Sequence, residues 1–267
     1  METALRFGAS KSHGGRHLAE AAEQFAAHLG SLLGRPIQSV VSSDYEAMFE
    51  SLIAGQLDLA WMPPLVHSRS TAKGAHLVAV SQRAGSVAYR SALLVRADSS
   101  YRNLTQLRGC RVAWVDKSSV SGYLFPRLYL LAAGVDPRTQ VASETFYGST
   151  ALACAAVAGG EADLCACYVS EATIGDPKQV DAQLRRAVGE KCDHLRVLYF
   201  TDPIPPDGIV VAASMSNAER AQIAAKLLSL HEHPEGARAL EQLMQAERLS
   251  PVDESTHKVL AGLRALA

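Results

Sequence analysis

Apolar and polar positions alternate between strand-like and helix-like patterns from the start of the chain. Residues 5–9 and 37–41 form short apolar runs typical of strands, and a capping box of Ser43 and Glu46 predicts that a helix begins there. A third strand is predicted over residues 57–61. Between the first two strands, apolar residues recur at helical spacing and end before a glycine: Leu18, Ala22, Phe25, Leu29, Leu32 and then Gly34. This β-α-β-α-β order predicts a parallel sheet covered by helices.

The same pattern returns in the middle of the chain. Strands are predicted over residues 111–115, 144–147 and 162–168, and helices over residues 122–133 and 149–158. Residues 54–60 match residues 159–165 at an offset of 105, and the same offset carries the helix start at 43–44 onto 148–149. Solenoid repeats are much shorter, so this offset predicts two similar α/β lobes. The alternative is that both segments are a common α/β corner.

The length and the proline content predict how the lobes are divided. At roughly 150 residues per domain, 267 residues make one large domain or two lobes. A proline-rich stretch at 201–208, followed by a strand at 209–213, predicts that the chain crosses back to the first lobe. Lobe 1 is then residues 1–86 with 203–267, covered by helices at 216–230, 234–246 and 253–265, and lobe 2 is residues 87–202. Two crossings predict a hinge with a ligand cleft between the lobes.

Composition and charge restrict the class of partner. The chain is 48% hydrophobic and 20% charged, which is typical of a soluble globular protein. Its formal net charge of −1 gives no electrostatic reason to expect a nucleic acid or an anionic membrane as partner. No apolar run reaches the roughly 18 to 20 residues of a membrane span, so no membrane insertion is expected. Any bound anion must therefore be held by local geometry.

The cysteines and the N-terminus predict a compartment. The five cysteines are an odd set without repeated C-x-x-C spacing, which favours buried thiols in a reducing environment over a disulfide framework. The first residues lead into a strand with no basic stretch, apolar run or cleavage site ahead of it. These features predict a cytoplasmic protein. The alternative is a periplasmic protein whose leader has been removed.

Loops after strand ends carry the candidate chemistry, because ligands of open parallel sheets bind outside the carboxyl ends of the strands. The loop at 116–122 places three serines and a glycine ahead of a helix: Ser118, Ser119, Ser121 and Gly122. N–H groups at a helix start and serine hydroxyls together can hold a phosphate-like or carboxylate group. The alternative is that these residues only cap the helix. His13 lies in another such loop, either as a ligand group or as an ordinary polar residue.

Five segments carry a resemblance to a known family: residues 43–47 (SDYEA), 55–64 (GQLDLAWMPP), 89–95 (YRSALLV), 104–126 and 202–207 (DPIPPD). They resemble the phosphate, phosphite and phosphonate substrate-binding proteins of ABC transporters, in register over about 5–215. The resemblance implies a type II periplasmic-binding-protein fold, in which two lobes, each a mainly parallel sheet flanked by helices, close on a ligand without catalysis.

The resemblance also implies a set of ligand-binding residues. In that family the serine-rich loop grips the phosphonate group, a tyrosine at a first-lobe helix start adds a hydroxyl, and acidic residues can meet an amine on the ligand. By matching motif, the implied set is Tyr45, Tyr89, Ser118, Ser119, Val120, Ser121, Gly122, Thr150, Tyr168, Glu171 and Asp207. Val120 stands where threonine is common and Thr150 where histidine is common. The ligand is therefore a phosphonate, a monoanion, a carboxylate or a related anion.

Two functions from different classes follow. The first is a non-catalytic, monomeric solute-binding protein that captures a small anionic or zwitterionic ligand for an ABC transporter permease or for sensing. The second is a cytoplasmic enzyme on the same fold, similar to chorismate-dehydrating proteins of the menaquinone route, with Asp207 or Glu171 as the base. No cofactor or metal is expected, because nucleotide-binding and Ser/His/Asp motifs do not occur in the sequence and Cys154, Cys165 and Cys167 lack a fourth ligand.

Overall fold

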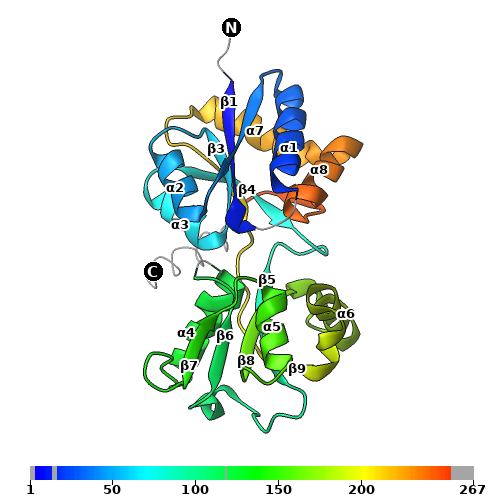
Figure 1. The fold of residues 1–267 in the computed structure, drawn as a ribbon. Helices are drawn as coiled ribbons and strands as arrows, with labels where there is room; N and C mark the ends of the chain where they lie inside the picture. Colours follow the sequence, from blue (N-terminus) through cyan, green and yellow to red (C-terminus); the bar gives the residue numbers. More distant parts are fainter. Residues whose placement is uncertain (1–3, 14–16, 118, 254–267) are drawn as a thin grey trace. The chain divides into compact units, whose positions relative to one another are not determined.

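The structure is a computed structural model that describes residues 4–13, 17–117 and 119–253. The chain divides into two compact units, one of Met1–Val87 with Pro205–Ala267 and the other of Ala88–Ile204 (Figure 1). The chain therefore leaves the first unit once and returns to it once. Each unit is an α/β body with its own sheet and its own apolar core.

The first unit is built on a six-stranded sheet in the order β11-β4-β10-β3-β1-β2. Its strands are β1 (Leu5–Ser10), β2 (Ile37–Ser42), β3 (Leu59–Met62), β4 (His76–Gln82), β10 (Gly208–Val211) and β11 (Arg248–Ser250). β1 pairs in parallel with β2 and β3, and β10 runs antiparallel between β3 and β4. Four of the six strands therefore run in one direction.

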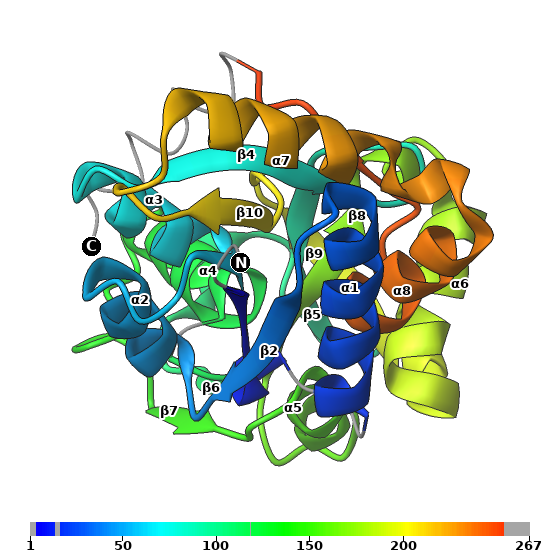
Figure 2. The same ribbon diagram turned by 90° about the horizontal axis from the view of Figure 1, so that it is seen from above.

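Helices cover both faces of this sheet (Figure 2). They are α1 (Leu18–Leu33), α2 (Tyr45–Ile53), α3 (Pro64–Ala72), α7 (Asn217–Ser229) and α8 (Pro234–Met244). The main core lies between the sheet and α1, α7 and α8, where Phe7 and Phe25 are fully buried with ring centroids 4.8 Å apart. Helices α2 and α3 pack on the opposite face, because the apolar side chains of α2, such as Met48 and Leu52, point there.

The second unit is a five-stranded sheet in the order β7-β6-β8-β5-β9, four of whose strands run in one direction. Its strands are β5 (Tyr89–Arg96), β6 (Arg111–Trp114), β7 (Ser143–Phe146), β8 (Leu164–Ser170) and β9 (Leu195–Phe200). Helices α5 (Thr150–Ala158) and α6 (Pro177–Val188) cover one face, and α4 (Phe125–Ala132) covers the other. Trp114 is fully buried on the α4 face, so it belongs to the core.

The predicted elements agree with this architecture except in four places. The sequence patterns did not indicate α3, α6, β9 or β11: α3 and α6 are rich in polar residues and β11 has only three residues, whereas β9 is an apolar run that the prediction missed. The capping box at Ser43 is wrong by one residue. The N-cap of α2 is Asp44, whose Oδ1 accepts a hydrogen bond from Ala47 N at 2.8 Å, while Glu46 forms an ion pair with Arg69. The helix predicted at 253–265 lies almost entirely outside the described residues.

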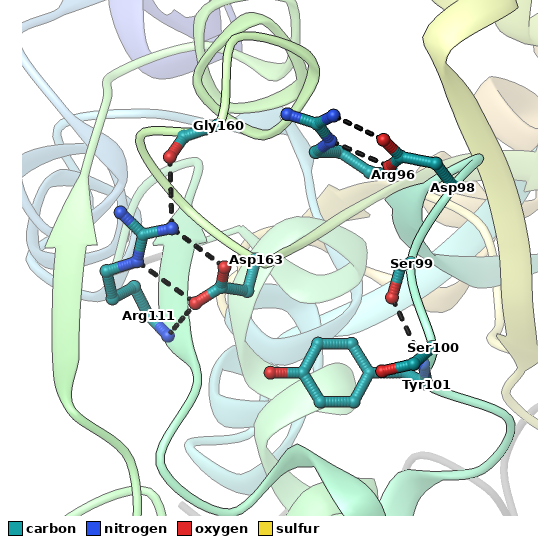
Figure 3. Close-up of a pocket in the computed structure, with 8 residues that line it drawn as sticks. All are labelled: Arg96, Asp98, Ser99, Ser100, Tyr101, Arg111, Gly160 and Asp163. Carbon is teal, nitrogen blue, oxygen red and sulfur yellow. Dashed lines mark hydrogen bonds and ion pairs between the residues drawn. The ribbon is translucent and has the colours of Figure 1, made fainter.

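The 105-residue repeat is present in side-chain detail. In the first unit, Asp58 accepts from the main-chain N (2.8 Å) and Nε (3.0 Å) of Arg6, whose Nη2 also reaches Gly55 O at 2.8 Å. In the second unit, Asp163 accepts from N (2.8 Å) and Nε (3.0 Å) of Arg111, whose Nη2 reaches Gly160 O at 3.0 Å (Figure 3). Each pair ties the start of one strand to the turn before its parallel neighbour.

The repeat extends to the sheets. Helices α2 and α5 span equivalent residues at the offset, and the pairs Phe7↔Leu59 and Val112↔Leu164 are equivalent too. The antiparallel strands follow the same plan, because β10 in the first sheet occupies the place that β5 has in the second. The register of β10 against β4 shifts after Ile209, and the register of β5 against β9 shifts after Leu93, the residue at the corresponding place. The two units are therefore variations of one five-stranded design, to which the first unit adds β11.

All five cysteines are buried and unpaired by disulfides, as the sequence predicted. Burial raises the pKa of Cys110 to about 12 and that of Cys192 to about 11. A hydrogen bond to Cys154 and burial raise the pKa of Cys165 well above its usual value. Within the described ranges, no three His, Cys, Asp or Glu side chains gather in a way that could hold a metal, and no helix has the length and apolar character of a membrane span.

We expect Asp163→Asn to lower the free energy of unfolding of the second unit by about 1–2 kcal/mol, because it removes charge-assisted hydrogen bonds from Arg111. The hydrogen bond from Arg111 lowers the pKa of Asp163, so this contribution is present near neutral pH and is lost as pH falls through the titration of the carboxyl group. Urea unfolding followed by Trp114 fluorescence in a Trp61→Phe background measures it.

Asp193→Asn is the matched control. Asp193 also pairs with an arginine, Arg185, but the two side chains are 61% and 44% exposed. Exposed ion pairs contribute little, so this variant should change stability far less than Asp163→Asn does. Equal losses in the two variants would contradict the role assigned to the Arg111 and Asp163 pair.

Candidate functional site

Two helix starts meet at one edge of the second sheet. Strands β6 and β7 are parallel neighbours, so their carboxyl ends lie at the same edge. The chain leaves β6 into a short π-helical turn, Val120–Leu124, that continues into α4, and it leaves β7 directly into α5. Main-chain bonds from Tyr147 N to Trp114 O (2.9 Å) and from Gly148 N to Val115 O (2.8 Å) hold the two connections together.

The serine loop is fixed by its own polar groups. Ser119 caps the turn, since its Oγ accepts a hydrogen bond from Gly122 N at 3.0 Å. The hydroxyl of Ser91, on β5, donates to Ser121 O at 2.6 Å and so ties the loop to the sheet. The Ser119 oxygen is used as an acceptor, which leaves its O–H able to donate elsewhere. Val120 and Ser121 occupy the first turn, where N–H groups have no intrahelical acceptor.

Gly122 is required by packing. A Cβ atom at this position would lie 2.4 Å from Val115 Cγ2, 2.6 Å from Val115 Cβ and 2.7 Å from Ser119 Oγ. No ordinary contact is that short, so any side chain here would displace the capping serine or strand β6. Gly122, which the sequence analysis assigned to the anion cradle, therefore allows the π-helical turn to pack closely against the end of β6.

The second helix start has similar polar chemistry. Ser149 is the N-cap of α5, with its Oγ accepting from Leu152 N at 3.3 Å, and Thr150 is the first helical residue. Val120 is only 5% exposed and offers no polar group beyond its main chain. Ser118, the remaining residue of the predicted cradle, lies outside the described residues. The described residues of the predicted cradle therefore offer neutral hydroxyls and main-chain N–H groups, and Lys117 of the same loop places its Nζ 5.8 Å from the centroid of the Phe146 ring at the end of β7.

Two predicted tyrosines pair beside the loop. Tyr89 on β5 and Tyr168 on β8 have ring centroids 4.9 Å apart at an interplanar angle of 35°. They approach each other because β5 and β8 are antiparallel, with Ser91 opposite Tyr168 and Tyr89 opposite Ser170. Since Ser91 also holds Ser121, the tyrosine pair and the serine loop belong to one continuous part of the second unit.

Both predicted acidic residues are engaged by arginines. In the second unit, Glu171 receives two hydrogen bonds from Arg90, and this contact raises the pKa of Arg90. In the first unit, Asp207 pairs with Arg83 Nη2 at 2.6 Å. Burial opposes ionisation of Asp207, but the charge of Arg83 outweighs it and leaves the pKa of Asp207 below its usual range. The Asp207 carboxyl is therefore expected to be ionised, and each of the two carboxyl groups faces a guanidinium.

The first unit gathers three rings near Asp207. His13, after β1, stacks on Trp61 of β3 with centroids 3.6 Å apart and planes 6° from parallel. Tyr45, the first residue of α2, meets the His13 ring edge-on at 4.8 Å. Burial, the largest influence, lowers the pKa of His13 to about 4, against the raising effect of Asp207. The histidine is therefore neutral at pH 7, and the stack carries no charge.

The sequence did not indicate several of these contacts. It indicated His13 but not its stacking on Trp61, and it did not identify Arg83 or Arg90 as partners of the acidic residues. The Arg90 contact depends on the β5–β8 register, which periodicity does not supply. Tyr45 and Asp207 lie in the first unit, and the other described residues of the predicted set lie in the second. The predicted set is therefore supplied by both units.

A separate pocket of about 310 Å³ lies at the other edge of the second sheet (Figure 3). Its lining includes Arg111, which begins β6, and Arg96, which ends the antiparallel β5, so it is at the edge opposite the serine loop. Arg96 pairs with Asp98, and Arg111 pairs with Asp163. Because these charges compensate each other within the pocket, it has no uncompensated group for an anion.

A family assignment agrees with this geometry. The profile of the family described as "ABC transporter, phosphonate, periplasmic substrate-binding protein" matches residues 7–257. The chain belongs to this family. The predicted resemblance and the prediction of a solute-binding protein are confirmed, and the enzyme alternative receives no support. The periplasmic setting of the family fits the alternative compartment rather than the cytoplasm.

Individual relatives agree with the assignment. The chain is 31% identical to the phosphate-import protein PhnD of Mycolicibacterium smegmatis over 141 residues, which are 49% of this chain and 44% of that protein. It is 24% identical to the phosphonates-binding periplasmic protein of Escherichia coli, over 100% of this chain and 77% of that protein. The first match spans less than half of the mycobacterial protein.

Solved structures share the fold. XAC2383 from Xanthomonas citri bound to chloride has a TM-score of 0.82 at 22% identity, with 99% of this chain and 97% of that chain covered. PhnD1 from Prochlorococcus marinus in complex with methylphosphonate has a TM-score of 0.75 at 18% identity, with 98% of each chain covered. The predicted α/β periplasmic-binding-protein fold is therefore confirmed.

Gly122→Ala tests the packing of the serine loop in this phosphonate-family protein. We expect a loss of about 1–3 kcal/mol in unfolding free energy, because the added methyl group meets Val115 and Ser119. Gly175→Ala is the control, since a Cβ there meets nothing within 4 Å and its backbone φ lies outside the left-handed region. Thermal melting of both variants measures the difference; an equally small effect in both would mean that the loop can relax.

His13 provides a second test. We expect its imidazole C–H signals, assigned by comparison with His13→Asn, to stay constant from pH 8 to about pH 5.5 and to titrate near pH 4. As the pH falls below the usual histidine value, the unfolded chain gains a proton that the native state resists, so stability should decrease. A midpoint above pH 6 in the NMR titration would contradict the buried, neutral stack.

Proposed function

We propose that this protein is a non-catalytic periplasmic receptor that captures a small oxyanion of the phosphate, phosphite or phosphonate class and delivers it to an ABC transporter permease. The observation that carries the proposal is the pair of helix starts at the carboxyl ends of β6 and β7, one of them capped by Ser119 and closed against the strand by Gly122. Such a site holds an anion with dipoles and N–H groups rather than with net charge.

The ligand class is supported by chemistry and by relatives. Hydroxyls of Ser119, Ser121 and Thr150, with first-turn N–H groups, supply several donors to one centre, which suits a tetrahedral oxyanion. The curated relatives are named for phosphate import and for phosphonate binding. Thr150, at the start of the second helix, adds a hydroxyl without adding a charge.

We further propose how capture takes place. The protein acts as a monomer, and its two units close on the ligand, with Tyr45 and Asp207 contributed by the first unit. The chain crosses between the units twice, after Val87 and before Pro205, which suits a hinge. Capture of this kind requires no proton transfer, and Asp207 and Glu171 are each paired with an arginine. The ligand is expected to leave the protein chemically unchanged.

Ser119→Ala combined with Ser121→Ala tests the cradle. We expect phosphate, phosphite or methylphosphonate to raise the Tm of the wild type, and the double variant to lose that shift, because two donors are removed from the anion. Ser99→Ala is the control: its Oγ also accepts a main-chain N–H, from Tyr101 at 3.1 Å, but at the opposite sheet edge. Binding that survives in the double variant would remove this loop from the site, and a ligand converted during incubation, as detected by mass spectrometry, would contradict the receptor function.

A further inference from the structure

The two acidic residues of the predicted site have partners that determine what they can recognise. In the first unit, Arg83 donates through Nη2 to Asp207 at 2.6 Å, and its Nε and Nη2 both reach Met244 O, at 3.0 and 2.7 Å. The side chains of Arg83 and Asp207 are 18% and 19% exposed. The pair is therefore largely withdrawn from water and anchored at three hydrogen bonds, unlike a surface ion pair.

The second unit repeats the arrangement with different residues. Arg90 donates through Nε and Nη2 to the two oxygens of Glu171, and its Nη1 donates to Thr201 O at 2.8 Å. The side chains are 23% and 32% exposed. This is a bidentate pair, which is the strongest geometry available to an arginine and a carboxylate. Arg90 lies between the carboxylate and a main-chain carbonyl, so all of its nitrogens have acceptors.

An ammonium group on a ligand needs an uncompensated carboxylate. A carboxylate already neutralised by a guanidinium offers it little net attraction, and the arginine beside it repels a second cation. To bind, the ammonium would have to displace charge-assisted hydrogen bonds, each more costly to break than a neutral one. For an oxyanion the effect of the arginines is the opposite. Two uncompensated carboxylates would repel it, whereas two carboxylates paired with arginines do not.

We infer that the ligand of this protein is an oxyanion without an ammonium group, such as inorganic phosphate, phosphite or a simple alkylphosphonate, and that the Arg83–Asp207 and Arg90–Glu171 pairs exclude aminoalkylphosphonates. The inference rests on the proposed oxyanion-binding function. It assigns Arg83 and Arg90 the role of specificity-determining residues. They act by neutralising the carboxylates, which would otherwise favour a zwitterionic ligand.

Ethylphosphonate and 2-aminoethylphosphonate form the matched pair of probes, because they differ only in a terminal amine. Isothermal titration calorimetry of the full chain, with phosphate and phosphite measured alongside, should give at least about tenfold tighter binding of ethylphosphonate than of its amino analogue. Equal or tighter binding of 2-aminoethylphosphonate would overturn the inference while leaving the receptor function intact. Binding of none of the four compounds would overturn the proposed function and the inference together.

Arginine variants test the cause of the selectivity. Arg83→Met and Arg90→Met each expose a carboxylate, so we expect the ratio of 2-aminoethylphosphonate affinity to ethylphosphonate affinity to rise by about 10-fold or more. Arg185→Met, which removes an exposed pair with Asp193, should leave the ratio unchanged. Because Arg90→Met can also weaken the fold, circular dichroism and melting accompany each titration, and Arg83→Met serves as the second variant. An unchanged ratio in both folded variants would show that these pairs do not determine specificity.

Discussion

The capture of an aspartate by the main chain and guanidinium of one arginine sets the geometry of both units. Arg6 holds Asp58 and Arg111 holds Asp163, and each contact fixes how the chain turns from a helix into the parallel strand beside the arginine. Because the turn is fixed, the register of the two parallel strands is fixed as well. This register positions the helix starts at the other end of the strands. The edge at which we propose that the ligand binds is thus positioned from the opposite end of the sheet.

Much of this arrangement could be predicted from the sequence, because it depends on local patterns. Glycine stops, the apolar periods and the 105-residue offset indicated the strands and helices of both units, and the offset proves to include strand pairing and side-chain bonds. The serine loop could be recognised for the same reason, since helix capping is local. The shift of the α2 cap from Ser43 to Asp44 is a limit of this approach: both are good caps, and only the main-chain geometry selects between them.

The remaining parts of the site depend on contacts between distant residues. Arg90 meets Glu171 through the β5–β8 register, and Arg83 meets Asp207 because β4 and β10 are neighbours across more than a hundred residues of chain. The stack of His13 on Trp61 likewise needs β1 beside β3. Residue types identified the acidic groups but not their compensation, and compensation removes most of the attraction of a carboxylate for a cation. The electrostatics of the site were therefore the least predictable part.

The burial of the thiols determines how the folded protein responds to an oxidising compartment. At the repeat offset, Cys154, Cys165 and Cys167 of the second unit occupy the positions of Phe49, Ala60 and Met62 in the first, so they are packing residues. A thiol exchanges with disulfides only as thiolate; the hydrogen bond with Cys154 and burial raise the pKa of Cys165, and burial raises the pKa of Cys167, so these two thiols stay protonated. Once folded, the protein is therefore expected to keep these thiols reduced in an oxidising environment. Its cysteines, which as a sequence pattern suggested the cytoplasm, are compatible with an oxidising compartment as well.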